Sequence, residues 1–445
     1  MTRTPALPAL IMAAACLAVA APPPAKLTLD QAIDLALRNN RALAIAGAQT
    51  DEMKAARKVA GANYFPRIST SATYFRLTET EVLQFAQGSF GTFPGLGALP
   101  TSQLIAKQGD LNQVLVRNQV VQPLTQLFRV REGDRVARAD EAASVARLAG
   151  LRNQISFRVR QIYYGLIAAQ VDRALATEQV QFATEETVEW EQNVLRGAAL
   201  EVSLTEARTR VLQAKQDELT ARMRQQDLFA QFDDVVGLPA GTTVEVEMEV
   251  SASLEVPTRD ECMHLADAAT PEIAEAEQMV GKAKAAVRAS QYEYIPDLAV
   301  FARHDYQNGV AFLFHNYGVV GAEFSFTIFD GGKRRAGISQ RQAQYRQAVQ
   351  NLARLKEAAE ANVQVALDKI EQIRSLTDLA QQVADLRSDA LRIASAQLAQ
   401  NAVLPTKVTE AKVALSKARA DLVKAQLAYV QAQAELQVVI GRLPR

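Results

Sequence analysis

The chain repeats one pattern twice, and each copy contains a helix too long for a globular core. Residues 196–211, RGAALEVSLTEARTRV, align without a gap with residues 400–415, QNAVLPTKVTEAKVAL. Residues 28–68 align in the same way with residues 258–298, so that YFPRI in the first copy corresponds to YIPDL in the second. An internal repeat of this kind means that one structural unit occurs twice.

Both copies predict the same order of elements. The first repeat, 21–239, is expected to hold a helix at 28–62, strands near 68–77 and 113–122, a long helix near 129–195 and a helix near 203–236. The second repeat, 258–445, is expected to hold a helix near 258–293, strands near 298–307 and 317–329, a long helix near 334–398 and a helix near 407–440. Residues 240–257 read as a linker. At 1.5 Å per residue, the long helices would reach about 100 Å.

The last helix shows how such lengths are stabilised. Its apolar residues recur at alternating steps of three and four, which is the heptad pattern of a coiled coil. They are Val408, Ala411, Leu415, Ala418, Leu422, Ala425, Tyr429, Ala432, Leu436 and Val439. The alternative, a helix packed on a globular core, leaves the whole apolar seam without a partner of matching length. The pattern therefore favours long coiled-coil hairpins.

The N-terminus predicts export from the cytoplasm. Arg3 precedes an Ala-rich apolar run, and Ala18-Val19-Ala20 fits the small-x-small cleavage pattern of a signal peptide over residues 1–20. A second interpretation, lipid attachment at Cys16, stays open. The chain has two cysteines, which offers no disulfide framework. Its 49 basic and 49 acidic residues balance, and nothing in this charge indicates a nucleic-acid partner.

The four expected strands have the length and alternation of strands that cross a bilayer. In the last of them, Phe324, Phe326 and Ile328 alternate with Ser325 and Thr327, so we expect the first three to face lipid and the others to face water. The Gly- and Pro-containing segment 78–112 suits a long external loop. A soluble alternative, in which two hairpins pack on the helices, is compatible with each strand taken singly.

Four strands cannot close a barrel, and an open sheet leaves backbone groups unpaired in lipid. At least two chains must therefore share one barrel: two chains would give about eight strands, a barrel filled by its own side chains, and three would give about twelve. The geometry predicts a homo-oligomer.

With these features the sequence resembles the TolC-like outer-membrane efflux channel family. The resemblance rests on the doubled starts LALRNNRAL and LADAATPEI, on YFPRI and YIPDL, on FDGGKRRAGI, and on the tips GAALEVSLTEA and NAVLPTKVTEA. It covers residues 28–441. It implies a mainly α chain with a membrane β-barrel portion: a homotrimer whose twelve-stranded barrel continues into a periplasmic α-helical barrel. It also implies export in concert with a periplasmic adaptor protein and an inner-membrane transporter.

The resemblance places two roles at the hairpin tips. For adaptor contact, the matching positions are Gly197, Ala198, Leu200, Asn401, Ala402 and Leu404. For a periplasmic gate, they are Glu410 and Lys407 on the second tip, with Ser203 and Glu206 on the first. Three copies of Glu410 would form an acidic ring, but the Lys407 side chains could pair with it. The alternatives are turn chemistry for the first set and helix-dipole stabilisation of the carboxylates for the second.

The remaining candidate site is the joint between barrel and tunnel. In the second repeat it comprises Phe329, Asp330, Gly331, Gly332 and Arg334, and in the first it is marked by Phe128. Glycine suits a point where a strand must turn into a helix. Because the first repeat has Pro123 and no glycine pair, we expect the two joints to differ in geometry.

No catalytic pattern emerges. The three histidines are scattered without metal-ligand spacing, and Gly331-Gly332-Lys333 lacks the rest of a phosphate loop. We therefore expect no enzyme activity, metal or cofactor. Two rivals to small-molecule efflux are a duct for protein secretion, which uses the same fold, and a secreted coiled-coil structural protein without a pore.

Overall fold

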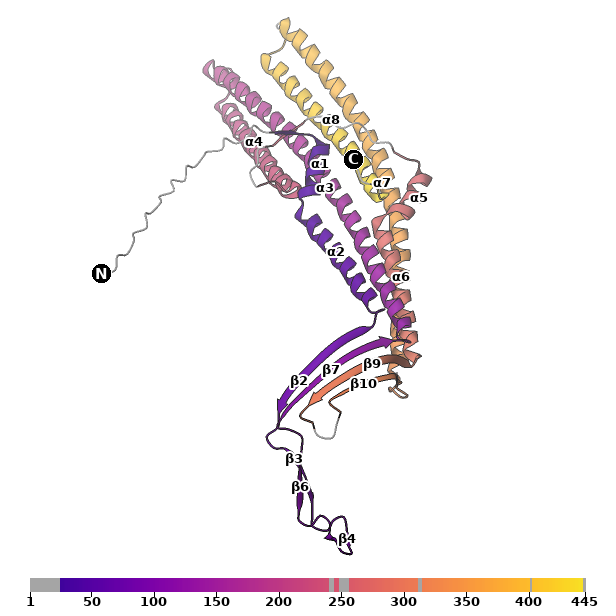
Figure 1. Ribbon diagram of the computed structural model, residues 1–445. Coiled ribbons are helices and arrows are strands. Elements are labelled where there is room, and N and C mark those ends of the chain that lie inside the picture. Colours follow the sequence, from indigo (N-terminus) through magenta and orange to yellow (C-terminus); the bar gives the residue numbers. More distant parts are fainter. Residues whose placement is uncertain (1–24, 240–243, 248–255, 311–313, 401, 443–445) are drawn as a thin grey trace, which may run out of the picture.

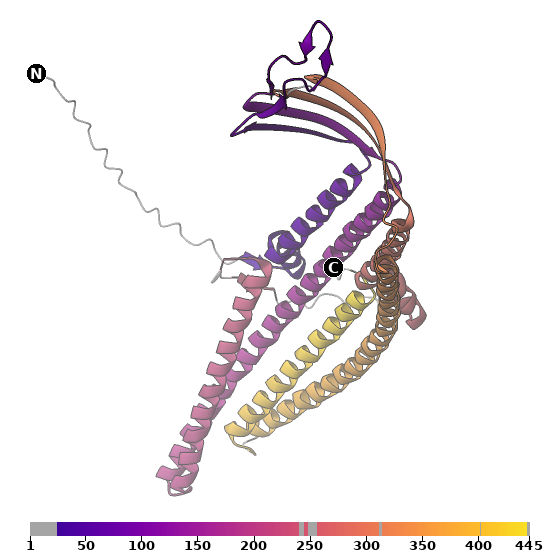
Figure 2. The same cartoon turned by 90° about the horizontal axis from the view of Figure 1, so that it is seen from below.

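The computed structural model describes residues 25–239, 244–247, 256–310, 314–400 and 402–442. A curved sheet stands at one end of the molecule, and two long helical hairpins run away from it (Figures 1 and 2). The tips of the two hairpins lie apart at the opposite end. The predicted signal peptide, and with it Cys16, lies outside the described residues.

Both halves contain two shorter helices, one very long helix and a returning helix. In the first half these are α1 (Leu29–Asn39), α2 (Arg41–Ala62), α3 (Leu127–Leu195) and α4 (Glu201–Val236). In the second they are α5 (Arg259–Ala269), α6 (Pro271–Gln291) with the 3₁₀ turn η1 (Tyr292–Tyr294), α7 (Lys333–Ala399) and α8 (Pro405–Val439). The mainly α fold with a small sheet is confirmed.

The single helices expected at 28–62 and 258–293 are each broken in two. Asn40 has an extended backbone, and its side chain accepts the N–H groups of Ala42 and Leu43, which starts a new helix. Thr270 is extended in the same way because Pro271 follows it, and the residue before a proline is disfavoured in the helical region. The breaks let α1 and α5 leave the direction of α2 and α6.

Small residues dock these short helices onto the long ones. Ala32 and Ala36 of α1 are fully buried, and so are their repeat equivalents, Cys262 and Ala266 of α5. The first pair belongs to a core with α3 and α4 residues such as Val159, Tyr163 and Phe232, and the second to a core with α7 and α8. Burial also raises the pKa of the Cys262 thiol. The duplicated sequence thus builds two equivalent cores near the middle of the molecule.

The main sheet has four antiparallel strands in the order β10-β9-β7-β2. They are β2 (Arg67–Arg76), β7 (Asn112–Pro123), β9 (Asp297–Asn308) and β10 (Asn316–Ser325). Each strand is joined to a helix, so the strand order continues as the helix order α7-α6-α3-α2, whose neighbours pack on one another. The sheet and the helices therefore form one continuous wall (Figure 1).

The last strand is shorter than the expected 317–329. It ends at Ser325, which pairs with Asp297, the first residue of β9. Pro296 precedes that residue and has no N–H group for a ladder, so residues 326–329 have no strand to pair with. Only Phe324 of the three expected lipid-facing residues lies in a strand. Phe326 and Ile328 lie in the connection to α7.

Register separates the sheet into two faces. One row, Ile68, Val120, Ala302 and Val320, is apolar across all four strands. On the opposite face one row is Ser71, Arg117, Asp305 and Tyr317. Phe324 shares the first face. The first face also carries some polar side chains, and four of them hydrogen-bond to one another, Thr70 to Asn118 and His304 to Asn316. One face therefore suits lipid and the other suits water.

The segment 78–112 is a ribbon that projects beyond the sheet. It contains β3 (Glu81–Phe85) paired with β6 (Leu104–Gln108), and a small hairpin of β4 (Thr92–Phe93) and β5 (Gly97–Ala98) at its end. The Asp110 N–H group donates to the Gly309 carbonyl at 2.6 Å, which ties the ribbon to the neighbouring loop.

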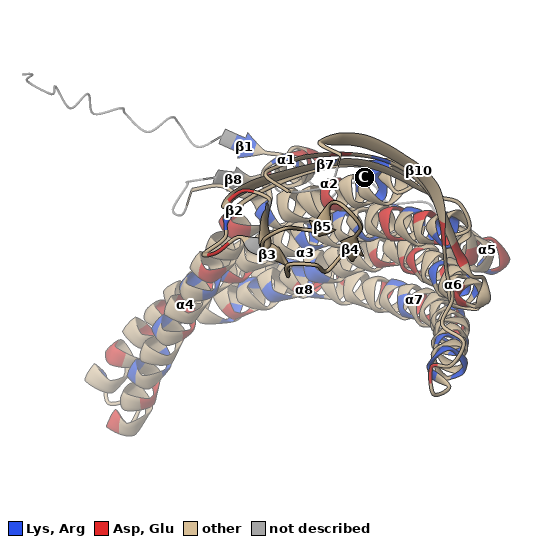
Figure 3. Cartoon of the chain, turned by 60° about the horizontal axis from the view of Figure 1, so that its bottom comes forward, with Lys and Arg blue, Asp and Glu red and all other residues tan. Residues whose placement is uncertain are grey.

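Charges of both signs are spread along the helices, whereas the strands carry few (Figure 3). In the described part of the chain, no helix combines the length and apolar composition needed to cross a membrane.

A short parallel pair joins the two ends of the first repeat. β1 (Ala25–Leu27) pairs with β8 (Val244–Val246), which lies in the expected linker. The Tyr163 hydroxyl of α3 donates to the Leu27 carbonyl at 3.0 Å and lies 3.1 Å from the Glu247 carbonyl. Burial raises the pKa of Tyr163 to about 12, so the hydroxyl remains a donor at neutral pH.

Replacing Tyr163 with Phe should lower the free energy of unfolding by about 1–2 kcal/mol, because the buried Leu27 carbonyl loses its donor and the Glu247 carbonyl loses a polar neighbour. Thermal unfolding of the detergent-solubilised protein, followed by circular dichroism, measures the change. Tyr429→Phe in the second core is the matched control, since the Tyr429 hydroxyl has no hydrogen bond to another described residue. Equal losses in the two variants would contradict the proposed anchoring.

Candidate functional site

The joint of the second repeat is organised around Arg334. Its guanidinium lies 5.1 Å from the ring centroids of both Tyr294 and Phe326. Arg334 Nε also donates to Asp330 Oδ2 at 2.7 Å, and Nη2 bonds the Thr327 carbonyl. The side chain therefore holds the connection after β10, the start of α7 and η1 together.

Asp330 caps the long helix that follows. Its carboxylate accepts the N–H of Gly332 at 2.9 Å and that of Arg334 at 3.1 Å. Gly331 and Gly332 adopt positive φ angles of 66° and 87°, a region that favours glycine. The hydrogen bond from the Arg334 side chain, with those from the backbone, lowers the pKa of Asp330 below its ordinary value of 3.8.

The first joint uses different chemistry. β7 ends at Pro123, and Gln126, the residue before α3, has a negative φ of −62°. Thr125 Oγ1 donates to the Pro296 carbonyl at 2.7 Å and accepts the Leu298 N–H at 2.8 Å. The two joints thus differ in local geometry, and Thr125 links the first to the start of β9.

Aromatic and ionic contacts complete the first joint. Phe128 packs on Tyr292 with ring centroids 5.8 Å apart, and Arg129 pairs with Asp297. The sequence pattern predicts Phe128 and Arg334 at the joints, but it assigns no contact to Thr125, Arg129 or Asp297. The repeated YxP motif, in YFPRI and YIPDL, is an available signal for Asp297 alone, because Thr125 and Arg129 lie outside it. Phe329 and Ile328, by contrast, are strongly exposed in the single chain.

The two hairpin tips are built alike. At the first tip, Gly197 has a φ of 69°, and the Ala198 N–H donates to the Asn193 carbonyl at 2.8 Å. At the second, the Ala402 N–H donates to the Gln397 carbonyl at 2.9 Å. Leu200 and Leu404 hold the equivalent extended positions before α4 and α8, and both side chains are exposed. Asn401 lies outside the described residues.

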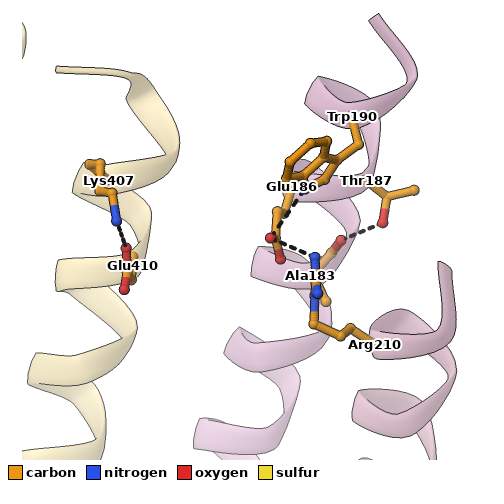
Figure 4. Close-up of polar contacts among 7 residues, drawn as sticks. All are labelled: Ala183, Glu186, Thr187, Trp190, Arg210, Lys407 and Glu410. Carbon is orange, nitrogen blue, oxygen red and sulfur yellow. Dashed lines mark hydrogen bonds and ion pairs between the residues drawn. The ribbon is translucent and has the colours of Figure 1, made fainter. Parts of the chain in front are cut away.

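The gate candidates of the second tip are paired with each other. Lys407 Nζ lies 2.8 Å from Glu410 Oε2 on the same helix, and both side chains are more than half exposed (Figure 4). The hydrogen bond to Glu410 raises the pKa of Lys407 above its ordinary value of 10.5. The ammonium is therefore charged at neutral pH. At the first tip, the equivalent Ser203 and Glu206 lie in the first turns of α4, and Glu206 is exposed.

The first hairpin has ion pairs that cross between its two helices. Glu186 of α3 lies 2.8 Å from Arg210 of α4, and Trp190 Nε1 donates to Glu186 at 3.3 Å (Figure 4). Arg208 lies 3.0 Å from Glu191 in the same way. These contacts hold α3 to α4 near the first tip, whereas the Lys407–Glu410 pair stays within α8. Among the described residues, no group of three or more His, Cys, Asp or Glu side chains is placed to hold a metal ion.

Comparison with known proteins identifies the family. A family model described as outer membrane efflux protein matches residues 32–238 and 263–442, one segment in each repeat. The chain belongs to this family. It is an efflux protein of the outer membrane, and its helical part extends into the periplasm. The family consists of channels rather than enzymes.

Solved structures share the fold at low sequence identity. The Campylobacter jejuni CmeC outer membrane channel matches with a TM-score of 0.77 and 15% identity, over 93% of this chain and 85% of CmeC. VceC from Vibrio cholerae matches with a TM-score of 0.74 and 16% identity, over 94% of this chain and 97% of VceC. The MtrE channel of Neisseria gonorrhoeae matches with a TM-score of 0.72 and 16% identity, over 94% of this chain and 89% of MtrE. A search of curated proteins finds no match.

The joint yields a pH-dependent prediction. Because the folded-state pKa of Asp330 is lowered, its stabilising effect is present above pH 3.8 and is lost as the pH falls through the lower folded value. Asp330→Ala should therefore lower the melting temperature at pH 5–7, and the difference from wild type should shrink below about pH 4.

Lys333→Ala is the matched control, since it changes an exposed charge beside the same turn. Melting curves in detergent at several pH values measure both variants. A difference for Asp330→Ala that stays constant down to pH 2.5 would contradict the role of the ionised carboxylate.

Proposed function

We propose that three copies of this chain form a passive export duct that works with a periplasmic adaptor protein and an inner-membrane transporter. The observation that carries the proposal is the continuous wall: four strands of membrane length, apolar on one face and polar on the other, join helices that reach about 100 Å. A coiled-coil structural protein without a pore has no use for such a sheet.

The edges of the sheet support assembly from several chains. β2 and β10 each pair on one side only, which leaves a row of unpaired backbone groups on the other. In lipid these groups must be paired, so β10 of one protomer meets β2 of the next. Three copies give a barrel of about twelve strands, which is wide enough for a lumen, whereas two give about eight and a filled interior.

Exposed apolar stripes on the helices support the same arrangement. On α7 the exposed residues Leu376, Leu379, Val383, Leu386 and Ile393 follow heptad spacing. On α4, at the opposite flank of the molecule, Leu212, Leu219 and Met223 do likewise (Figure 1). Each fully buried Leu contributes about 1.5–3 kcal/mol. Contact between α7 of one protomer and α4 of its neighbour would cover both stripes and close the tunnel.

The exposed hairpin tips are the part of the chain that the periplasmic adaptor protein and the inner-membrane transporter can reach. We assign adaptor contact to the turns around Gly197, Ala198 and Leu200 and around Asn401, Ala402 and Leu404, and a periplasmic gate to Lys407 and Glu410 with Ser203 and Glu206. The 2.8 Å pair favours a gate in which each Glu410 is neutralised by its own Lys407, in place of an acidic ring.

The duct itself is tested by purification from outer-membrane fractions. We expect heat-modifiable trimers on gel electrophoresis and discrete conductance steps in planar bilayers, because a closed water-filled barrel conducts ions. A soluble monomer that gives no conductance steps would overturn the proposal.

Substitutions at the tips separate docking from conduction. Leu200→Asp combined with Leu404→Asp should abolish export in cells, because two exposed apolar contacts become charged, while single-channel conductance stays unchanged. Leu212→Asp, in the proposed contact between protomers, should instead reduce the yield of trimers. Normal export by the double variant would remove these leucines from the adaptor interface.

Substitutions that change the charge of Lys407 or Glu410 test the proposed gate. Lys407→Asp leaves Glu410 unpaired and adds a second carboxylate per chain, so cation selectivity and closed-state conductance should both change. Glu410→Gln should change selectivity in the opposite direction. If both variants behave as wild type in bilayers, these residues do not form the gate.

A further inference from the structure

The polar face of the sheet carries one cluster of three charged side chains. Arg117 of β7 and Asp305 of β9 are direct cross-strand partners, and Arg117 Nε lies 2.8 Å from Asp305 Oδ1. Arg303, two residues before Asp305 and on the same face, places its Nε 2.7 Å from the other carboxylate oxygen. The residues above and below Arg117 on this face of β7 are Leu115 and Gln119. The cluster is therefore an isolated feature of the middle of the sheet.

This face is the hollow side of the sheet. A cavity of about 940 Å³ lies between the base of the sheet and the end of α2. All the strand residues that line it belong to the same face as the cluster, among them Ser69, Gln119, Ala299 and Glu323. In a closed barrel the hollow side encloses the lumen. Arg117, Arg303 and Asp305 therefore face the path of the cargo.

The cluster has an excess of positive charge, and that charge is open to the lumen. Two guanidinium groups oppose one carboxylate, so each chain has a surplus of one positive charge at this level. The Asp305 side chain is only 8% exposed, whereas the Arg117 side chain is 52% exposed. The acidic member is thus covered by its partners, and the cation remains accessible to passing solutes.

The rest of the lumen face does not offset this surplus. The only other charged strand residues on it are Arg67, Asp297 and Glu323, at the base of the sheet. There Arg67, together with Arg129 from α3, balances the two carboxylates, and Arg129 pairs directly with Asp297. Arg76, the remaining charged residue of the four strands, lies on the lipid face.

We propose that three copies of the Arg117–Asp305–Arg303 cluster form a positively charged belt inside the barrel, and that the belt makes this part of the channel favour anionic cargo. Its ligands are small organic acids and inorganic anions, which the exposed guanidinium groups attract. A water-filled passage with low-dielectric walls strengthens the field of such a belt, and rings of arginine favour anions in other pores. This proposal rests on the proposed trimeric duct.

The test measures ion selectivity of the purified channel in planar bilayers, with potassium chloride at different concentrations on the two sides. Arg117→Gln should lower the chloride-to-potassium permeability ratio by on the order of threefold at 0.1 M salt, with a smaller change at 1 M because of screening. Asp305→Asn removes the negative charge and should raise the same ratio. Arg117→Lys keeps the charge and should retain most of the wild-type selectivity.

Arg76→Gln is the matched control, because it removes the same charge from the opposite face of the same sheet and should leave selectivity unchanged. A merely structural ion pair predicts a different result: Arg117→Gln would lower the melting temperature without shifting the permeability ratio, and that outcome overturns the belt. Equal shifts for Arg76→Gln and Arg117→Gln would overturn it as well. If the wild-type protein shows no conductance at all, the proposed duct is refuted and not the belt alone.

Discussion

The rest of the structure depends on one constraint, the need to pair every backbone hydrogen-bonding group inside a bilayer. A sheet of four strands with two free edges meets this need only when other copies complete it. The same constraint also affects the helices at the periplasmic end. Since strand order continues into helix order, closing the barrel also brings the helical flanks of neighbouring copies together. In the proposed trimer, membrane insertion and closure of the helical tunnel both follow from the contact between the sheet edges of neighbouring copies.

Much of this architecture can be predicted from the sequence because the sequence contains the same pattern twice. The hairpin tips, the long helices and the strands near Tyr64 and Tyr294 recur in both halves, so a weak pattern in one copy is supported by the other. The face that Phe324 occupies follows from simple alternation. Alternation continues past Ser325 to Ile328, but pairing does not, because the partner strand begins only after Pro296. The alternation in a sequence shows which residues favour a strand, but it does not show where the neighbouring strand begins or ends.

Side-chain contacts between distant segments were the least predictable part. The sequence pattern places Arg334 at the joint, but its position beside the Tyr294 and Phe326 rings depends on a turn about forty residues earlier in the chain. Thr125 bridges to Pro296 in the other repeat, which no local pattern indicates. The break at Asn40 was missed because an asparagine inside an apolar periodic run also fits an exposed helical position. At Thr270, by contrast, the following proline was a readable signal.

The parallel pair β1–β8 has a consequence for how the molecule is made. Ala25 pairs with Val244, so the segment Ala25–Leu27 can find its partner strand only after more than half of the chain has been synthesised. Contacts between residues this far apart in sequence slow folding, because the entropy of closing the intervening loop is lost before the contact is gained. The segment Ala25–Leu27 therefore stays without its strand partner while the first half of the chain is made, and an unpaired, extended leading end is the form in which a polypeptide can be threaded through a narrow pore.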